Sequence, residues 1–97
     1  MARFDYYRGD GGLAVDVQHD HVATNTRVVI PLLPMNQAPP PTRKLHPVLP
    51  INGQNYLLMT HTLVAVLRSD LGDPLGSLEQ YEDKIKEALD FLLIAGY

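Results

Sequence analysis

The densest group of side chains able to hold a metal ion or transfer protons lies between residues 16 and 21. It consists of Asp16, His19, Asp20 and His21. A His-x-His pair in a loop can present two imidazoles to a metal, but this spacing matches no established site and supplies no obvious third and fourth ligand. We therefore favour a solvated loop, and we predict neither a metal nor another cofactor.

A second group has the side chains that cleavage of RNA would need. Arg27 follows the polar segment 24–26, so a cation and hydroxyls stand together where they could grip a phosphate or assist attack by a 2′-hydroxyl. A proton acceptor would also be required, and the chain offers His19, His21 or His61. The spacing does not support this chemistry, and the sequence has no Gly-rich phosphate loop or nucleophile elbow. The residues alone favour an interaction module over an enzyme and predict no catalytic residue.

Composition limits the remaining classes of function. The 97 residues form one predicted domain, 1–97, and the absence of cysteine excludes disulfides and thiol chemistry. The net charge is −3, and the eight Lys and Arg residues are scattered, so a broad basic surface for nucleic acid is not expected. No run of about eighteen apolar residues occurs, and none follows the first basic residue. We expect a soluble, cytoplasmic protein with no membrane contact and no cleaved signal.

Short strands are predicted over most of the chain. Residues 13–18 alternate in polarity, which predicts a strand with Leu13, Val15 and Val17 inward and Asp16 toward solvent. Residues 27–33 read as a strand buried on both faces, in which Pro31 is tolerable only at an edge or a bulge. Further strands are expected at 3–7, 45–51, 54–60 and 62–67, with turns or loops at 8–12, 19–26, 34–43, 52–53 and 70–76. Asn52-Gly53 is typical of a type I′ hairpin turn. In this pattern His46 and His61 lie in or beside strands, where a lone histidine is more often structural than catalytic.

One amphipathic helix is predicted from Ser77 to Tyr97. Ser77 and Gln80 suit a capping box, and Glu82 stands four residues before Lys86 in the favourable orientation. The apolar stripe of this helix consists of Leu78, Tyr81, Ile85, Leu89 and Leu92. From Phe91 onward the sequence is apolar around the whole circumference, so a core or a partner must cover the last turns.

These elements predict a mostly β protein with a C-terminal α-helix. Several short antiparallel strands followed by one helix favour a small, strongly bent sheet or partly open barrel that the helix packs against.

Several motifs, taken in order, resemble the CcdB toxins of bacterial toxin–antitoxin systems. The motifs are residues 15–20 (VDVQHD), 27–32 (RVVIPL), 45–51 (LHPVLPI) and 58–60 (LMT), followed by a C-terminal helix that closes on glycine and one bulky apolar residue. The match is collinear over nearly the whole chain. A random strand would not reproduce the order and spacing of the first two motifs.

The resemblance implies a fold, a set of partners and a mode of action. The fold is a small antiparallel SH3-like barrel of the CcdB/MazF type. The implied protein is a homodimer whose C-termini lie close to the two-fold axis and insert into the DNA gate of the gyrase A subunit, where they trap gyrase on cleaved DNA. A cognate antitoxin binds the toxin and removes it from gyrase, and contact with operator DNA is expected only through the antitoxin. The toxin itself performs no covalent chemistry.

The resemblance also carries over site residues by position. The implied gyrase contacts are His21, Val22, Ile94, Ala95, Gly96 and Tyr97. The implied antitoxin contacts lie in two Gly- and Pro-rich loops and are Arg8, Gly9, Asp10, Pro41 and Arg43. Ala95 stands where the best-known members have Trp, and Tyr97 where they have Ile.

Two other functions stay open from the sequence. One is a MazF-like endoribonuclease of the same fold, and the other is a degenerate member that binds an antitoxin but not gyrase. The acidic net charge weighs against the ribonuclease, because an RNA-cleaving groove needs local positive charge.

Overall fold

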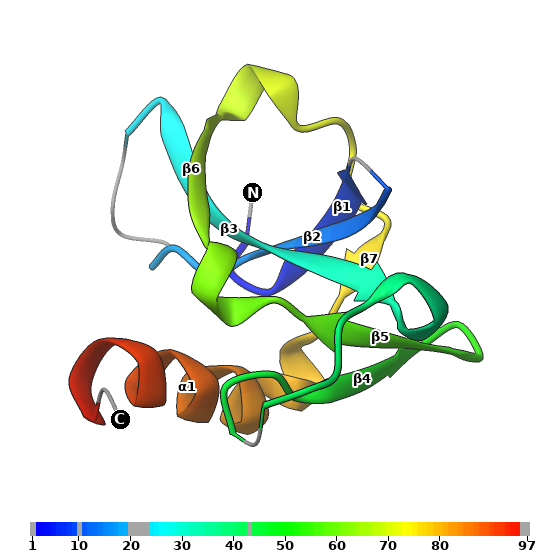
Figure 1. The fold of residues 1–97 in the computed structure, drawn as a ribbon. Helices are drawn as coiled ribbons and strands as arrows, with labels where there is room; N and C mark the ends of the chain where they lie inside the picture. The colour runs from blue at the N-terminus through cyan, green and yellow to red at the C-terminus, as the bar shows by residue number, and fades with distance from the viewer. Residues whose placement is uncertain (1, 10, 20–23, 43, 96–97) are drawn as a thin grey trace.

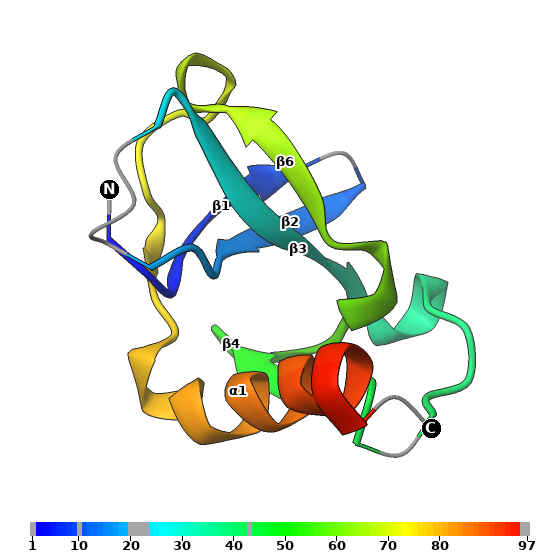
Figure 2. The same ribbon diagram turned by 90° about the vertical axis from the view of Figure 1, so that its left-hand side faces the viewer.

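The computed structural model describes residues 2–9, 11–19, 24–42 and 44–95. These residues form an antiparallel sheet curled into a half-barrel, with one helix, α1 (Glu82–Asp90), lying along one end of it in both views (Figures 1 and 2). The strands are β1 (Asp5–Gly9), β2 (Gly12–Asp16), β3 (Thr26–Pro34), β4 (Val48–Ile51), β5 (Gln54–Leu58), β6 (Val64–Leu67) and β7 (Gly76–Ser77). The predicted mostly β fold with a C-terminal helix is confirmed.

β3 is the strand that joins the two halves of the sheet. The strand order is β4-β5-β3-β2-β1-β7, and β6 pairs separately with β3. Residues 26–29 of β3 pair with β6, whereas residues 32–34 pair with β5. Pro31 lies between these stretches, and its carbonyl accepts the Met59 amide at 2.9 Å. A proline is tolerated inside this central strand because the partner strand on one side changes at this point.

The most regular hairpin joins β4 to β5 through Asn52 and Gly53. Both residues have positive φ angles, 52° and 80°, as a type I′ turn requires. The predicted hairpin is confirmed, although each strand is shorter than the predicted ranges.

The main core lies between the concave face of the sheet and α1. Side chains from five strands meet Leu78, Ile85 and Ala88 there, and all three are buried. The strand residues of this core are Tyr6, Val15, Ile30, Leu32, Leu49, Ile51 and Leu58. Phe4 joins them with a left-handed φ of 74°, its amide bonded to the Asp16 carbonyl and its carbonyl to the Leu78 amide.

Two predictions about the first hairpin are wrong. β1 begins two residues later than expected and continues through Arg8 and Gly9, which pair with Leu13 and Gly12 instead of forming a turn. Asp16 was expected to face solvent, but it is fully buried. The alternating pattern assumed a strand covered on one side, whereas β2 is also covered on its second face, where Ala14 is buried as well.

The helix begins later than predicted and is not uniform. Ser77 belongs to β7 and pairs with Asp5 of β1, which keeps it extended and prevents the capping box. Its hydroxyl instead accepts the Glu79 amide at 3.2 Å. A 3₁₀ turn (Glu79–Tyr81) leads into α1, and a π-helical turn (Phe91–Ala95) follows it. The predicted ion pair between Lys86 and Glu82 is confirmed.

Candidate functional site

The C-terminal helix separates a packing stripe from an exposed tip. Leu78, Ile85 and Ala88 are buried, and Tyr81 and Leu89 are half-buried against the same core. The tip is the π-helical turn, in which Leu93 is 63% and Ile94 78% exposed. In Figure 1 this end of the helix, coloured red, extends past the edge of the sheet. Two large apolar side chains are therefore presented to solvent in a π turn, a feature that is frequent at functional sites.

Only part of the predicted gyrase-binding set lies within the described residues. Ile94 is the strongly exposed side chain of the tip, and Ala95 is the last residue of the π turn. His21, Val22, Gly96 and Tyr97 lie outside the described residues.

The predicted antitoxin-binding residues lie in two separate places. Arg8 is exposed near the end of β1, beside half-buried Gly9, and Pro41 is exposed in the extended segment after the 3₁₀ turn Met35–Gln37. Asp10 and Arg43 lie outside the described residues. Figure 2 shows the β1–β2 end and the segment containing Pro41 along the same side of the molecule, with the end of β3 between them. A ligand that contacts both would have to be extended.

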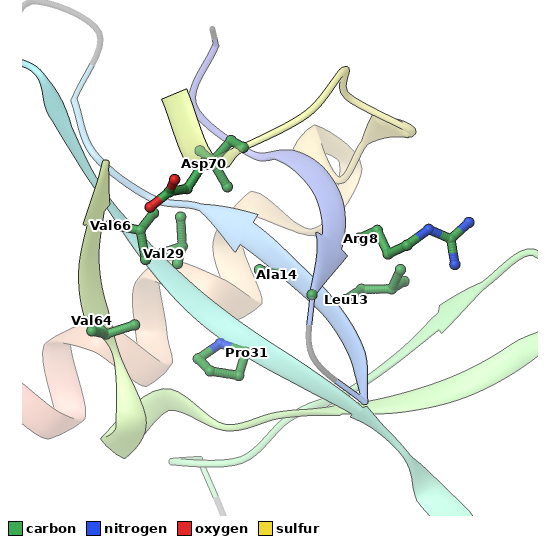
Figure 3. Close-up of a pocket in the computed structure, with 10 residues that line it drawn as sticks. Arg8, Leu13, Ala14, Val29, Pro31, Val64, Val66 and Asp70 are labelled. Atoms are coloured by element: carbon green, nitrogen blue, oxygen red, sulfur yellow. The ribbon is translucent and has the colours of Figure 1, made fainter. Parts of the chain in front are cut away.

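A hollow of about 410 Å³ lies on the second face of the sheet, next to Arg8 and Gly9. Figure 3 shows Val64 and Val66 of β6 beside Val29 and Pro31 of β3, with Asp70 above them, whereas the Arg8 guanidinium points away from the hollow. The walls are therefore mainly apolar, with one carboxylate at the rim.

β6 supplies an exposed apolar edge that the sequence did not reveal. Val64 and Leu67 are each 47% exposed, and the strand VAVL carries no charge. Among the described residues its only strand partner is β3. Uncharged edges of this kind pair readily with another strand. The sequence alone predicted a strand at residues 62–67, and its exposure became visible only with the sheet order.

Asp16 and Arg27, which a metal site or a ribonuclease would use, form a buried ion pair with each other. Arg27 donates from Nε and Nη2 to the two carboxylate oxygens of Asp16 at 2.7 and 3.0 Å, and both side chains are almost fully buried. Nη2 also donates to the Gln18 carbonyl at 3.2 Å, and the Gln18 side chain accepts the Val28 amide at 3.0 Å. Asp16 is thus committed to Arg27 rather than to a metal, and Arg27 cannot grip a phosphate without leaving its carboxylate. Within the described ranges, no group of three or more His, Cys, Asp or Glu side chains could hold a metal.

Tyr7 lies near this ion pair on the same face of the sheet. Its side chain is fully buried, and no described residue gives its hydroxyl a hydrogen-bond partner. Burial raises the pKa of Tyr7, and the negative charges of Asp5 and Asp16 raise it further. The hydroxyl therefore stays protonated and does not act as a base at neutral pH.

Comparison with known families decides the relationship. The family model described as "CcdB protein" matches residues 3–96, which is nearly the whole chain. The chain belongs to the CcdB family. The resemblance seen in the strand motifs is thereby confirmed. As a CcdB family member, the protein is the toxin of a toxin–antitoxin module, and an antitoxin is its partner there. Among the described residues, no helix is long and apolar enough to cross a membrane.

Proposed function

We propose that this CcdB family protein acts as a homodimer on the gyrase A subunit, trapping gyrase on cleaved DNA without performing covalent chemistry itself. The observation that carries the proposal is the exposed tip of the C-terminal helix, where Leu93 and Ile94 project into solvent from the π-helical turn. Apolar side chains at a chain end, anchored by a buried stripe, suit insertion into a pocket of a large partner. Ile94, Ala95, Gly96 and Tyr97, helped by His21 and Val22, are the proposed contacts.

The proposed antitoxin contact is an extended segment lying along the side that carries Arg8, Gly9 and Pro41, together with Asp10 and Arg43. The apolar hollow beside Gly9 supports this proposal, because an extended peptide gains specificity by placing alternate side chains in pockets. We expect a swap of residues 8, 10 and 11 together with residues 39–43, with Gly9 and Gly12 kept for the β1–β2 pairing, to weaken antitoxin binding, measured by titration calorimetry, while the melting temperature stays unchanged.

A cleavage assay tests the proposed target. Purified protein is added to gyrase and supercoiled plasmid DNA, and separately to a long RNA. We expect linear DNA that depends on gyrase, and intact RNA. Removing Gly96 and Tyr97, or replacing Ile94 by Ser, should abolish DNA cleavage while the melting temperature stays within about a degree of the parent. The parent's RNA arm distinguishes the ribonuclease, which would degrade RNA without gyrase.

Leu75→Ser is the matched control, because Leu75 is 49% exposed in the loop before β7 rather than at the helix tip. This variant should retain full cleavage. Failure of the parent protein to produce linear DNA would contradict the gyrase target, and a toxic truncated protein would show that the tip is not the contact.

A further inference from the structure

Two histidines that are far apart in the sequence meet beside β4. His46 lies two residues before this strand and is only 8% exposed, whereas His61 is exposed in the 3₁₀ turn Thr60–Thr62. Nε2 of His46 is 2.7 Å from Nδ1 of His61, which is hydrogen-bond distance. The contact therefore ties the segment before β4 to the turn that follows β5.

The backbone of Thr42 determines which nitrogens carry protons. The Thr42 amide donates to Nδ1 of His46 at 3.1 Å, while the His46 amide donates to the Thr42 carbonyl at 2.9 Å. Because an amide N–H can only donate, Nδ1 of His46 must carry a lone pair, and neutral His46 must hold its proton on Nε2. Nε2–H then donates to His61, whose Nδ1 must also carry a lone pair.

Any additional proton breaks this arrangement. The two rings have four nitrogens, and the network requires two of them without a proton: Nδ1 of His46, facing Thr42, and one member of the His46–His61 contact. The neutral pair has two such nitrogens, but the singly protonated pair has only one. Wherever the third proton binds, two N–H groups face each other and one hydrogen bond is lost.

The segment closed by these contacts is held in an unfavourable backbone conformation. Lys44 has a left-handed φ of 64°. This conformation costs more free energy for a residue with a side chain than for glycine. The two bonds between Thr42 and His46 offset this cost. When the ring nitrogen no longer accepts the Thr42 amide, one hydrogen bond fewer holds the backbone of Lys44 in this left-handed conformation.

Few charged groups act on His46 from its surroundings. Burial is the main cause that lowers its pKa from the ordinary value of 6.5, and the charge of His61 is the second. Its own segment carries the exposed Lys44 and also Arg43, which lies outside the described residues, and β4 and β5 contain no charged residue. The charged residues of α1 are not among the groups that shift this pKa; they are Glu82, Asp83, Lys84, Lys86, Glu87 and Asp90. No described carboxylate therefore offsets a proton added to the pair.

We propose that His46 and His61 form a pH-sensitive latch, which holds Thr42 against His46 at neutral pH and releases the segment around Lys44 when acid adds one proton. The latch depends on a pair of side chains in this chain and not on the proposed target. The sign follows from the lowered pKa: the latch is fully closed above pH 6.5 and opens as the pH falls from there through the lower pKa of folded His46.

Amide hydrogen exchange on the full-length protein tests the latch. Exchange is followed by NMR at pH 7.5 and 5.5, and each rate is divided by the intrinsic rate at that pH. We expect the protection of the Thr42 and His46 amides to fall at pH 5.5, by up to about tenfold, because this pH lies one unit below the ordinary histidine pKa of 6.5. The Val17 amide, bonded to the Val28 carbonyl at 3.0 Å, should keep its protection.

Two comparisons make the outcome decisive. His19→Gln, at an exposed histidine outside the pair, should retain the full effect, whereas His46→Phe should leave Thr42 unprotected at both pH values. Imidazole ¹⁵N shifts of the parent provide a test that needs no variant: Nδ1 of both rings should be unprotonated at pH 7.5. Equal Thr42 protection at the two pH values, or a proton on Nδ1 of His46 at pH 7.5, would overturn the proposal.

Discussion

The ion pair of Asp16 and Arg27 is the most costly polar contact in the molecule to leave half made. Both charges are removed from water, so each depends on the other and on Gln18 for its hydrogen bonds. The Gln18 amide also donates to Asp16 at 2.9 Å, and the Gln18 side chain accepts the Val28 amide, which links the end of β2 to the start of β3. The pair therefore fixes the register of the first hairpin against β3.

Replacing Asp16 by Asn should lower the free energy of unfolding by about 3–5 kcal/mol, because it removes the negative charge that accepts two hydrogen bonds from the buried Arg27 guanidinium. Urea denaturation followed by circular dichroism measures the effect. Glu82→Gln breaks the exposed pair with Lys86 and should hardly move the denaturation midpoint. Equal midpoints for Asp16→Asn and the parent would show that Arg27 finds other partners.

Tyr7 should respond in the opposite direction. Its hydroxyl is buried and has no partner within the described part of the chain, so Tyr7→Phe removes an unsatisfied polar group without leaving a large cavity. We expect stability to be unchanged or to rise by about 1 kcal/mol. Tyr81→Phe is the comparison, since it removes a hydroxyl that donates to the Pro50 carbonyl at 3.3 Å and should not stabilise. A large loss in Tyr7→Phe would reveal a partner for this hydroxyl.

At the scale of elements, the C-terminal helix combines two independent parts. The stripe is needed for folding, while the tip is free to serve a partner. Ile85→Ala should cost about 2–5 kcal/mol, because it leaves a cavity under a fully buried side chain. Thermal melting measures this, and Glu87→Ala on the exposed face is the control. If Ile85→Ala melts like the parent, the helix is not an integral part of the core.

Sequence patterns predicted most elements but misplaced the contacts between them. Asn52-Gly53 identified its hairpin because both positive φ angles are a local requirement. The helical stripe was also readable, although Ala88 was missed because a small side chain is a weak apolar signal. Ser77 failed as a cap because pairing with Asp5 overrides a local preference. For the same reason the sequence could not show that His46 meets His61, or that Asp16 is buried with Arg27.

The roles predicted for the site residues stay predictions. Ile94 is exposed as a partner contact requires, and Pro41 and Arg8 are exposed as well. Their roles came from the resemblance rather than from periodicity, since exposure alone does not identify a partner. The exposure of the apolar edge of β6 could not be predicted, because the sequence of an apolar strand does not show whether another strand of the same chain covers it.

At the scale of the whole molecule, the exposed apolar surface predicts association. Val64 and Leu67 on β6 and Leu93 and Ile94 at the tip remain open to solvent in a chain of modest size. We expect a dimer in sedimentation equilibrium at low micromolar concentration, and a shift toward monomer for Leu67→Lys. Leu75→Lys, at an exposed apolar position away from both surfaces, should remain dimeric. A folded monomer of the parent at that concentration would refute this prediction.

The closure of β1 on β7 has a consequence for synthesis of the protein. Asp5 pairs with Ser77, and the Phe4 carbonyl accepts the Leu78 amide at 2.7 Å, so the earliest strand obtains its last neighbour from near the end of the chain. The buried residues of the helix that complete the core, Ile85 and Ala88, emerge from the ribosome later still. Folding therefore cannot finish before residues 76–88 have been synthesised, and contacts so distant in sequence form slowly. A newly made toxin thus passes through an interval in which its first strands exist but its helix tip is not yet held on a finished core.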